Sequence, residues 1–127
     1  MLRGLHYQVA PYAQAKLVRV LEGEVLDVVV DLRPHSATYG ESYSIRLSAE
    51  NKKQLFVPRG LAHGYVVLSE TAIFAYKVDN YYSKKSEGGL IYNDSRLKID
   101  WEISASDVIL SEKDKLLPTL GEHRPIR

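Results

Sequence analysis

Histidine can accept and release protons near neutral pH, and this sequence contains four histidines in different surroundings. His35 lies in a Pro/Ser turn and His123 in a polar tail, positions where side chains are commonly solvated. His6 lies in a strand-like hexapeptide near the start of the chain, and His63 lies in a glycine-bounded segment where a backbone can approach closely. His6 and His63 are therefore the candidates for acid–base chemistry, although a hydrogen-bonded structural role stays open for each.

Several other side chains could act as acids, bases or stabilising cations. They are Lys16, Tyr76, Lys77, Tyr82 and Asp114. Alternation along residues 71–78 puts Tyr76 on one face and Lys77 on the other, so Tyr76 could be a core aromatic or a reacting group. Asp114 is the third residue after Ser111, which fits a capping box at a helix start as well as catalysis. The periodicity of the sequence does not choose between these roles.

A metal site needs several ligating side chains, and few are available here. The chain contains no cysteine, and no second histidine follows His6 at His-x-His spacing. At most His6 and His63, together with carboxylates, could bind a metal, which is a small set for zinc or non-haem iron. The sequence therefore predicts no metal site.

The composition excludes several classes of protein. The net charge is +1 with 26% charged residues of both signs mixed along the chain, whereas a nucleic-acid binder concentrates Lys and Arg on one face. No apolar run is long enough to span a membrane, and the first residues lack the pattern of a signal peptide. We expect a single domain over residues 1–127, a cytoplasmic location, and neither a membrane nor a nucleic-acid partner.

Strand patterns dominate the chain. Runs rich in β-branched and aromatic residues predict strands at residues 16–22, 25–32, 41–47, 54–57, 64–68 and 71–78. Residues 80–92 are polar and contain glycine, so we expect a loop there with at most one short strand. One short helix is predicted after Ser111, ended by Pro118. This order of elements indicates an all-β sandwich or barrel.

The spacing of Arg3 and His6 predicts a local irregularity. Residues three apart point to opposite faces of a flat strand, so these two side chains can serve one site only if the chain bulges or turns. Gly4 is the position where that bulge could form.

Nine motifs follow one another along the chain. They are Arg-Gly-Leu-His-Tyr-Gln (3–8), Lys-Leu-Val-Arg-Val (16–20), Gly-Glu-Val-Leu-Asp-Val (23–28), Leu-Ser-Ala-Glu-Asn-Lys (47–52), Gly-Leu-Ala-His-Gly-Tyr (60–65), Tyr-Lys (76–77), Tyr-Tyr (81–82), Asn-Asp (93–94) and Leu-Ser-Glu-Lys-Asp (110–114). Taken together they resemble the dTDP-4-dehydrorhamnose 3,5-epimerase family, from Leu2 to about Leu117. The resemblance implies an all-β, cupin-like jelly-roll β-barrel with a short C-terminal helix, working without metal or cofactor.

The resemblance also implies a reaction. The family takes a proton from the carbon next to the ketone of a dTDP-4-keto-6-deoxy sugar and returns one from the opposite face, at carbon 3, carbon 5 or both, in dTDP-rhamnose or related deoxysugar biosynthesis. The matching positions are His6 as general base, Asp114 as its partner, Tyr76 as proton donor and Lys16 as enolate stabiliser. The positions that match substrate-binding residues are Arg3, His63, Tyr82, Glu87 and Lys113.

The start of the chain leaves other hypotheses open. Family members carry a segment before the Arg-Gly-Leu-His motif that exchanges strands between subunits and contributes to nucleotide binding. Because the motif begins at residue 3 here, we expect a domain shortened at its N-terminus. The alternative function is a catalytically weak or inactive cupin barrel that binds a sugar nucleotide, and a metal-dependent cupin of another reaction class is a third hypothesis. A homodimer formed by sheet packing is also expected.

Overall fold

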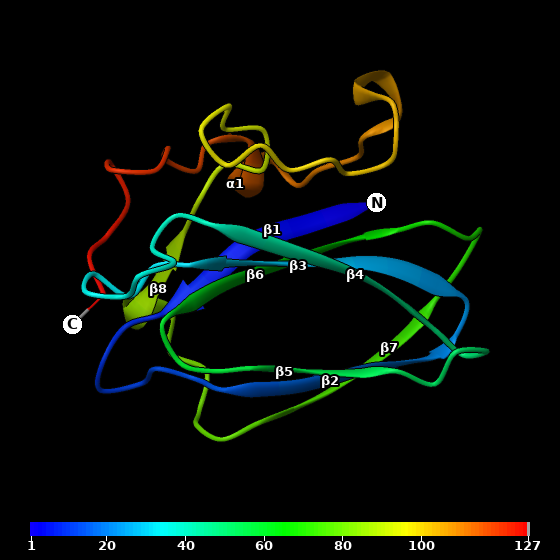
Figure 1. The fold of residues 1–127 in the computed structure, drawn as a ribbon, viewed down its shortest axis with the longest axis horizontal. Coiled ribbons are helices and arrows are strands. Elements are labelled where there is room, and N and C mark those ends of the chain that lie inside the picture. Colours follow the sequence, from blue (N-terminus) through cyan, green and yellow to red (C-terminus); the bar gives the residue numbers. More distant parts are fainter. Residues whose placement is uncertain (127) are drawn as a thin grey trace.

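The computed structural model describes residues 1–126, which form two antiparallel β-sheets that face each other (Figure 1). The five-stranded sheet has the order β4-β3-β6-β1-β8, and the three-stranded sheet has the order β5-β2-β7. The strands are β1 (Leu2–Gln8), β2 (Lys16–Glu22), β3 (Glu24–Asp31), β4 (Ser42–Ser48), β5 (Gln54–Val57), β6 (Leu61–Val67), β7 (Ile73–Val78) and β8 (Glu87–Gly89). The helical elements are η1 (Lys84–Ser86), η2 (Ala105–Asp107) and α1 (Glu112–Lys115). No helix within residues 1–126 is long and apolar enough to cross a membrane.

The predicted all-β jelly-roll class is confirmed, with two separate facing sheets in place of a closed barrel. The strands at residues 16–22 and 54–57 are found with the predicted bounds, and β8 is the one short strand expected within residues 80–92. The main difference is β6, which begins at Leu61 and not at Gly64. Gly60 ends the preceding turn with a φ of +92°, and Leu61 and His63 then pair with Asp31 and Val29 of β3. His63 therefore lies within a strand.

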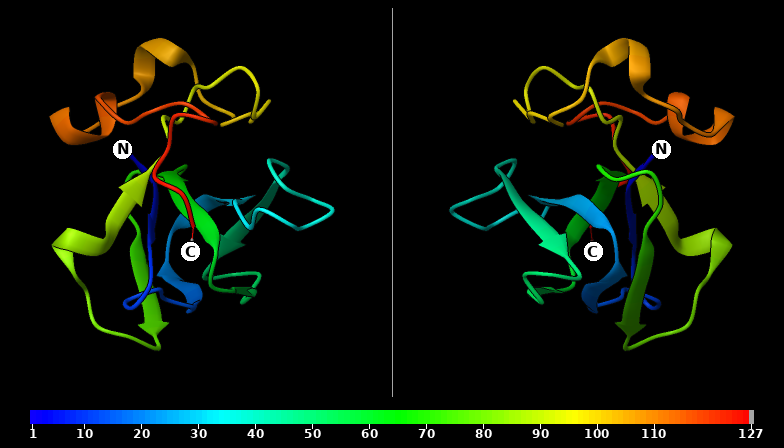
Figure 2. Two further views of the ribbon diagram at one scale, coloured as in Figure 1. Left: turned by 90° about the vertical axis from the view of Figure 1, so that its left-hand side faces the viewer. Right: turned by 90° about the vertical axis from the view of Figure 1, so that its right-hand side faces the viewer.

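Strand β3 is apolar on both faces because both faces are covered. Leu26, Val28 and Val30 pack into a core on the outer side of the five-stranded sheet, against residues of the C-terminal segment such as Trp101. Val25 points the other way, into a smaller core between the two sheets. Figure 2 shows the C-terminal segment, yellow to red, lying over the five-stranded sheet. Each buried apolar side chain of this size stabilises the fold by about 1.5–3 kcal/mol.

The C-terminal segment brings α1 next to β1. Leu5 and Leu90 exchange two backbone hydrogen bonds of 3.1 and 2.9 Å, and the Leu2 N–H donates to the Ile109 carbonyl at 3.0 Å. Ser111 then caps α1 by accepting the Asp114 N–H at 3.1 Å, as the sequence predicted. The helix is a single turn, and its role is to place one residue against β1.

Candidate active site

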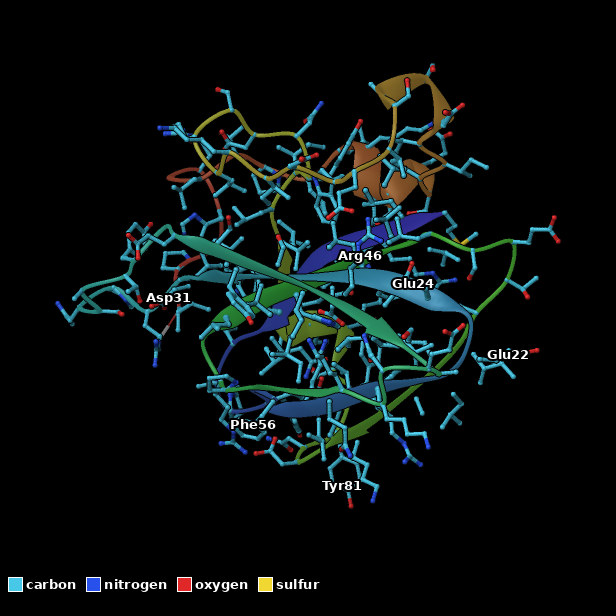
Figure 3. All side chains as sticks on the ribbon, turned by 45° about the vertical axis from the view of Figure 1, so that its right-hand side comes forward. Glu22, Glu24, Asp31, Arg46, Phe56 and Tyr81 are labelled. Atoms are coloured by element: carbon cyan, nitrogen blue, oxygen red, sulfur yellow. The ribbon has the colours of Figure 1, made fainter. Side chains whose placement is uncertain are left out.

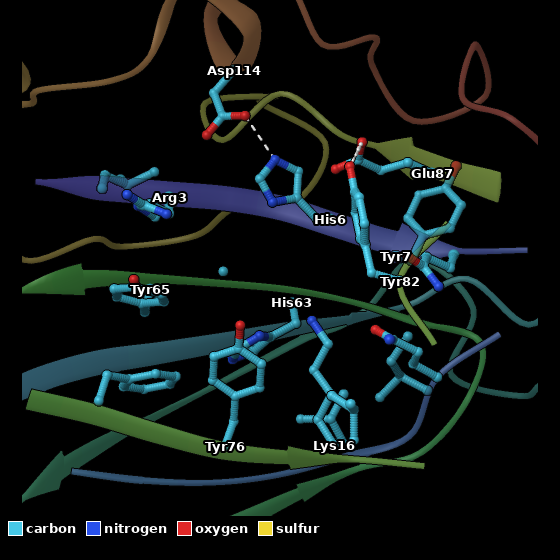
Figure 4. Close-up of a pocket in the computed structure, with 18 of the residues that line it drawn as sticks. Arg3, His6, Tyr7, Lys16, His63, Tyr65, Tyr76, Tyr82, Glu87 and Asp114 are labelled. Atoms are coloured by element: carbon cyan, nitrogen blue, oxygen red, sulfur yellow. Dashed lines mark hydrogen bonds and ion pairs between the residues drawn. The ribbon is translucent and has the colours of Figure 1, made fainter. Parts of the chain in front are cut away.

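A cavity of about 740 Å³ opens between the two sheets (Figure 4). Its walls come from β1 and β6 on one side and from β2 and β7 on the other, with α1 at the rim. All of the predicted site residues line it: Arg3, His6, Lys16, His63, Tyr76, Tyr82, Glu87, Lys113 and Asp114. The structure thus brings together residues that are distant in the sequence, such as Arg3 and Asp114, which lie 111 positions apart.

A short polar contact on the cavity wall joins His6 to Asp114. His6 Nε2 lies 2.7 Å from Asp114 Oδ1, and the other carboxylate oxygen accepts the Gly4 N–H at 3.2 Å. The Asp114 residue is only 3% exposed, whereas His6 is partly exposed to the cavity. An ionised carboxylate can only accept hydrogen bonds, so it favours the tautomer with the proton on Nε2 and leaves Nδ1 with a free lone pair. Asp114 therefore holds His6 in the tautomer and the orientation that a general base requires.

Asp114 fills both roles that its spacing from Ser111 left open. Its backbone N–H receives the helix cap, while its carboxylate turns away from Ser111 and contacts His6. The side-chain half of a capping box is thus replaced by the contact with β1.

The predicted irregularity in β1 is present. The register of β1 against β6 shifts between Arg3 and His6, and Gly4 has a φ of +119°. A side chain at Gly4 would place its Cβ only 2.7 Å from the Gly64 Cα, so glycine is required on both strands for this close approach. The bulge turns both Arg3 and His6 toward the cavity.

The opposite wall carries Tyr76 and Lys16. Tyr76 on β7 and Lys16 on β2 come from the three-stranded sheet and point across the cavity toward His6, as Figure 4 shows. Tyr76 shares its face of β7 with Phe74, as alternation predicted, and the Phe74 ring stacks on Tyr65 with a centroid distance of 4.5 Å. The histidine and the tyrosine therefore face each other from different sheets.

A second buried polar pair, His63 and Asp27, lies close enough to Lys16 for the Asp27 charge to act on it. His63 Nε2 is 2.7 Å from Oδ1 of Asp27, although the angle is not that of a hydrogen bond, and Asp27 is fully buried. Burial lowers the pKa of Lys16, and the negative charges of Asp27 and Glu87 act in the opposite direction. A carboxylate inside a core is costly unless its neighbours compensate it, and the charge of Asp27 in turn favours the ammonium form of Lys16.

Sequence reasoning missed Asp27. The available signal was a lone carboxylate inside the apolar strand Val25–Val30, on the inward face that Val25 identifies. Alternation fixes the face of such a residue but not the partner that it meets across the sheet, here His63 of β6.

A charged group closes the rim of the cavity. Lys113 Nζ and the Tyr82 hydroxyl both reach Glu87 Oε2, at 2.6 and 3.1 Å. Burial acts to raise the pKa of Glu87, but the hydrogen bond and charge of Lys113 outweigh it and bring this pKa below its ordinary value. The same hydrogen bond raises the pKa of Lys113. An ammonium and an aromatic ring are thus held side by side at the cavity edge.

The remaining candidates lie elsewhere. Lys77 is exposed on the outer face of β7, and His35 is exposed in its turn. His123 is half-buried beside the rings of Tyr7 and Tyr39, so the expectation of a solvated side chain there was wrong: the C-terminal segment packs back on the sheet. Within residues 1–126, no three His, Asp or Glu residues are grouped so that they could hold a metal ion.

Comparison with known proteins agrees with this geometry. The family model described as dTDP-4-dehydrorhamnose 3,5-epimerase matches residues 1–122. The dTDP-4-dehydrorhamnose 3,5-epimerase of Escherichia coli K12 is 52% identical over 122 residues, which are 96% of this chain and 65% of that protein.

Solved structures of such enzymes have the same fold. The dTDP-4-dehydrorhamnose 3,5-epimerase of Elizabethkingia anophelis NUHP1 superimposes with a TM-score of 0.94 at 60% identity, covering 95% of this chain and 66% of that one. The dTDP-6-deoxy-D-glucose-3,5-epimerase of Legionella pneumophila Philadelphia 1, in complex with dTDP-4-keto-L-rhamnose, has a TM-score of 0.91 at 49% identity, covering 95% and 63%. The chain thus spans a little under two-thirds of the length of these relatives. It belongs to the dTDP-4-dehydrorhamnose 3,5-epimerase family.

Proposed function

We propose that this chain epimerises a dTDP-4-keto-6-deoxy sugar at carbon 3, carbon 5 or both. The observation that carries the proposal is the placement of the His6–Asp114 pair on one wall of the cavity and of Tyr76 on the facing wall. Inversion at carbon requires that a proton leave one face and another arrive at the opposite face. Two acid–base groups from different sheets satisfy that requirement.

The first step is removal of a proton from the carbon next to the ketone. The His6 Nδ1 lone pair takes this proton, the C–H electron pair moves toward the carbonyl, and an enolate forms. The imidazolium that results keeps its Nε2–H on Asp114, whose negative charge stabilises it. A positioned general base contributes about 10²–10⁴-fold to the rate, so other groups must supply the rest.

The second contribution is stabilisation of the enolate oxygen. Lys16 lies on the cavity wall with its ammonium partly withdrawn from water, where its charge acts more strongly than in solvent. His63, paired with the buried Asp27, stands beside it and could donate to the same oxygen. One such preorganised donor is worth about 3–4 kcal/mol of transition-state energy.

Reprotonation completes the reaction. Tyr76 donates its hydroxyl proton to the carbon from the side opposite His6, the carbon–hydrogen bond forms as the enolate returns to the ketone, and a tyrosinate remains. Proton exchange with water then restores neutral Tyr76 and neutral His6. The ketone of the substrate provides the electron sink throughout, so the atoms and charges balance.

The nucleotide part of the substrate would bind at the rim. Arg3 and Lys113 offer positive charge for a diphosphate, and the Tyr82 ring, 64% exposed, offers a flat apolar surface for a base. Glu87 fixes Lys113 and Tyr82 relative to each other through one carboxylate oxygen.

Deuterium exchange tests the proposal. The chain is incubated with dTDP-4-keto-6-deoxyglucose in deuterated water, and incorporation at carbons 3 and 5 is followed by NMR. We expect label at one or both carbons, with a His6→Ala variant as the control. Incorporation no faster than in that control contradicts the proposed function.

We also propose that the domain is one unit, residues 1–127, that forms a homodimer. The outer face of the three-stranded sheet exposes Leu17, Leu21 and Phe56, the last to 62%, and Figure 3 shows Phe56 on the side of this sheet that faces away from the five-stranded sheet. Light scattering should give twice the monomer mass, and Phe56→Lys should lower it. A monomeric mass at micromolar concentration contradicts the dimer.

A further inference from the structure

Two loops next to the cavity are joined by side-chain amides. The first connects β1 to β2 (residues 9–15), and the second follows β7 (residues 79–83). Gln14 Nε2 donates to the Asn80 carbonyl at 2.8 Å, and Asn80 Nδ2 donates back to the carbonyls of Pro11 and Ala13 at 3.1 and 3.3 Å. The Asn80 carboxamide oxygen also accepts the Tyr81 N–H at 2.9 Å.

Gln8 is the buried member of this group. It is the last residue of β1 and is 7% exposed. Its Nε2 donates to the carbonyls of Tyr12 and Tyr81 at 2.6 and 3.1 Å, and its Oε1 accepts the Ser83 N–H at 3.0 Å. Both N–H donors and the oxygen of this amide are therefore used, as a buried amide requires. We call Gln8, Gln14 and Asn80 the amide clamp.

The partners of Gln8 bracket one residue. The Tyr81 carbonyl belongs to the peptide group before Tyr82, and the Ser83 N–H belongs to the peptide group after it. One side chain thus fixes both peptide planes that flank Tyr82, and these planes set the direction in which its ring leaves the backbone. Tyr82 is 64% exposed, so the position of its ring depends on this backbone together with the hydrogen bond from its hydroxyl to Glu87.

Strand β1 links the clamp to the base. His6 and Gln8 are two residues apart on the same face of β1, a separation of about 7 Å along the strand. The strand that carries the His6 base therefore also fixes where Tyr82 stands. A nucleotide sugar has its base and its reacting carbon at opposite ends, so this distance decides whether both ends fit at once.

We propose that Gln8 is a positioning residue for nucleotide binding: through the amide clamp it holds the Tyr82 ring in register with His6. This inference rests on the proposed function for the identity of the ligand. It assigns Gln8 no contact with the reacting carbon. Its loss should therefore weaken nucleotide affinity while leaving the proton transfer chemistry in place.

The test uses dTDP alone as the probe, by calorimetry. Gln8→Leu keeps a side chain of similar size but removes all three hydrogen bonds; we expect affinity to fall about tenfold, the scale of one lost binding interaction. The fall should shrink to within about twofold in a Tyr82→Ala background, because Gln8 then has no ring to position. Ser69→Ala is the matched control: it removes a hydroxyl that bonds Glu24 and Thr71 at a turn outside the cavity lining, and it should bind dTDP normally.

Each outcome decides the inference. Wild-type affinity in Gln8→Leu overturns it, and so does a tenfold loss that persists undiminished with Tyr82→Ala, since Gln8 would then act on the ligand by another route. If Gln8→Leu does not fold, Asn80→Ala takes its place. This variant removes the hydrogen bonds that the Asn80 side chain makes with Pro11, Ala13 and Tyr81, and its dTDP affinity is judged by the same two criteria. A wild-type chain that does not bind dTDP contradicts the nucleotide role. A chain that binds dTDP but exchanges no deuterium contradicts the proposed epimerisation and leaves the clamp result standing.

Discussion

Replacing Asp114 by asparagine should disable the base while leaving the cavity intact. The carboxylate accepts two N–H groups, from His6 at 2.7 Å and Gly4 at 3.2 Å. An asparagine amide keeps one oxygen acceptor, but its NH₂ group would face a donor. The imidazole relieves that clash by moving its proton to Nδ1, which presents N–H to the substrate where a lone pair is needed.

The size of the effect follows from that tautomer change. A general base contributes about 10²–10⁴-fold, and the corresponding change in a Ser-His-Asp triad costs about 10⁴-fold. We expect deuterium exchange in Asp114→Asn to fall by about 10³-fold, which is about 4 kcal/mol of activation free energy. Folding stability should fall by only about 1–2 kcal/mol, since a single hydrogen bond is weakened.

The assay is the initial rate of deuterium incorporation into the keto sugar, measured with dTDP affinity in the same preparation. Asp114→Asn should bind dTDP within about threefold of wild type, because its carboxylate faces β1 and not the rim. An exchange rate within tenfold of wild type would refute the assignment of the His6–Asp114 pair as the base.

Three further outcomes follow from the structure. Lys16→Met should reduce exchange about 10²–10³-fold with little change in dTDP affinity, because one enolate donor is lost; an unchanged rate contradicts that role. Gly64→Ala should lower the free energy of unfolding, measured by urea titration, by about 1–3 kcal/mol, because the added Cβ would lie 2.7 Å from the Arg3 carbonyl oxygen. An unchanged urea midpoint would show that β1 can move away and that the close approach does not require glycine. Hydrogen bonds, the largest contribution coming from Arg33, hold the pKa of the Asp31 carboxyl well below its usual range, so the ionised carboxylate stabilises the fold at neutral pH and this stabilisation is lost as the pH falls below about 4. The difference in free energy of unfolding between wild type and Asp31→Asn should therefore shrink below that pH. A difference that does not change with pH contradicts this role of Asp31.

Local patterns predicted most of the fold and part of the site. Alternation and turn residues identified the strands, and the three-residue spacing of Arg3 and His6 predicted the bulge that Gly4 forms. Family resemblance, and not periodicity, linked His6 to Asp114, which lies 108 positions away in the chain. Contacts between distant elements have no local signature, which is why the partners of Asp27 and Gln8 appear only in the folded chain.

The bounds of β6 show the same limit. The predicted strand over residues 64–68 left residues 61–63 outside it, but β6 begins at Leu61, and Gly64 lies within the strand at the point where β1 passes closely. The requirement for glycine came from a neighbour across the sheet, which the sequence of that segment does not contain.

The central claim is that a proton leaves toward His6 and another returns from Tyr76 across the cavity. The most direct measurement is the ratio of inverted to uninverted labelled sugar after incubation in deuterated water, compared between wild type and Tyr76→Phe. Wild type should place deuterium on carbon with inverted configuration, whereas Tyr76→Phe should still exchange through His6 but return the label mainly to the original face. An unchanged proportion of inverted product in Tyr76→Phe would contradict the two-sided mechanism.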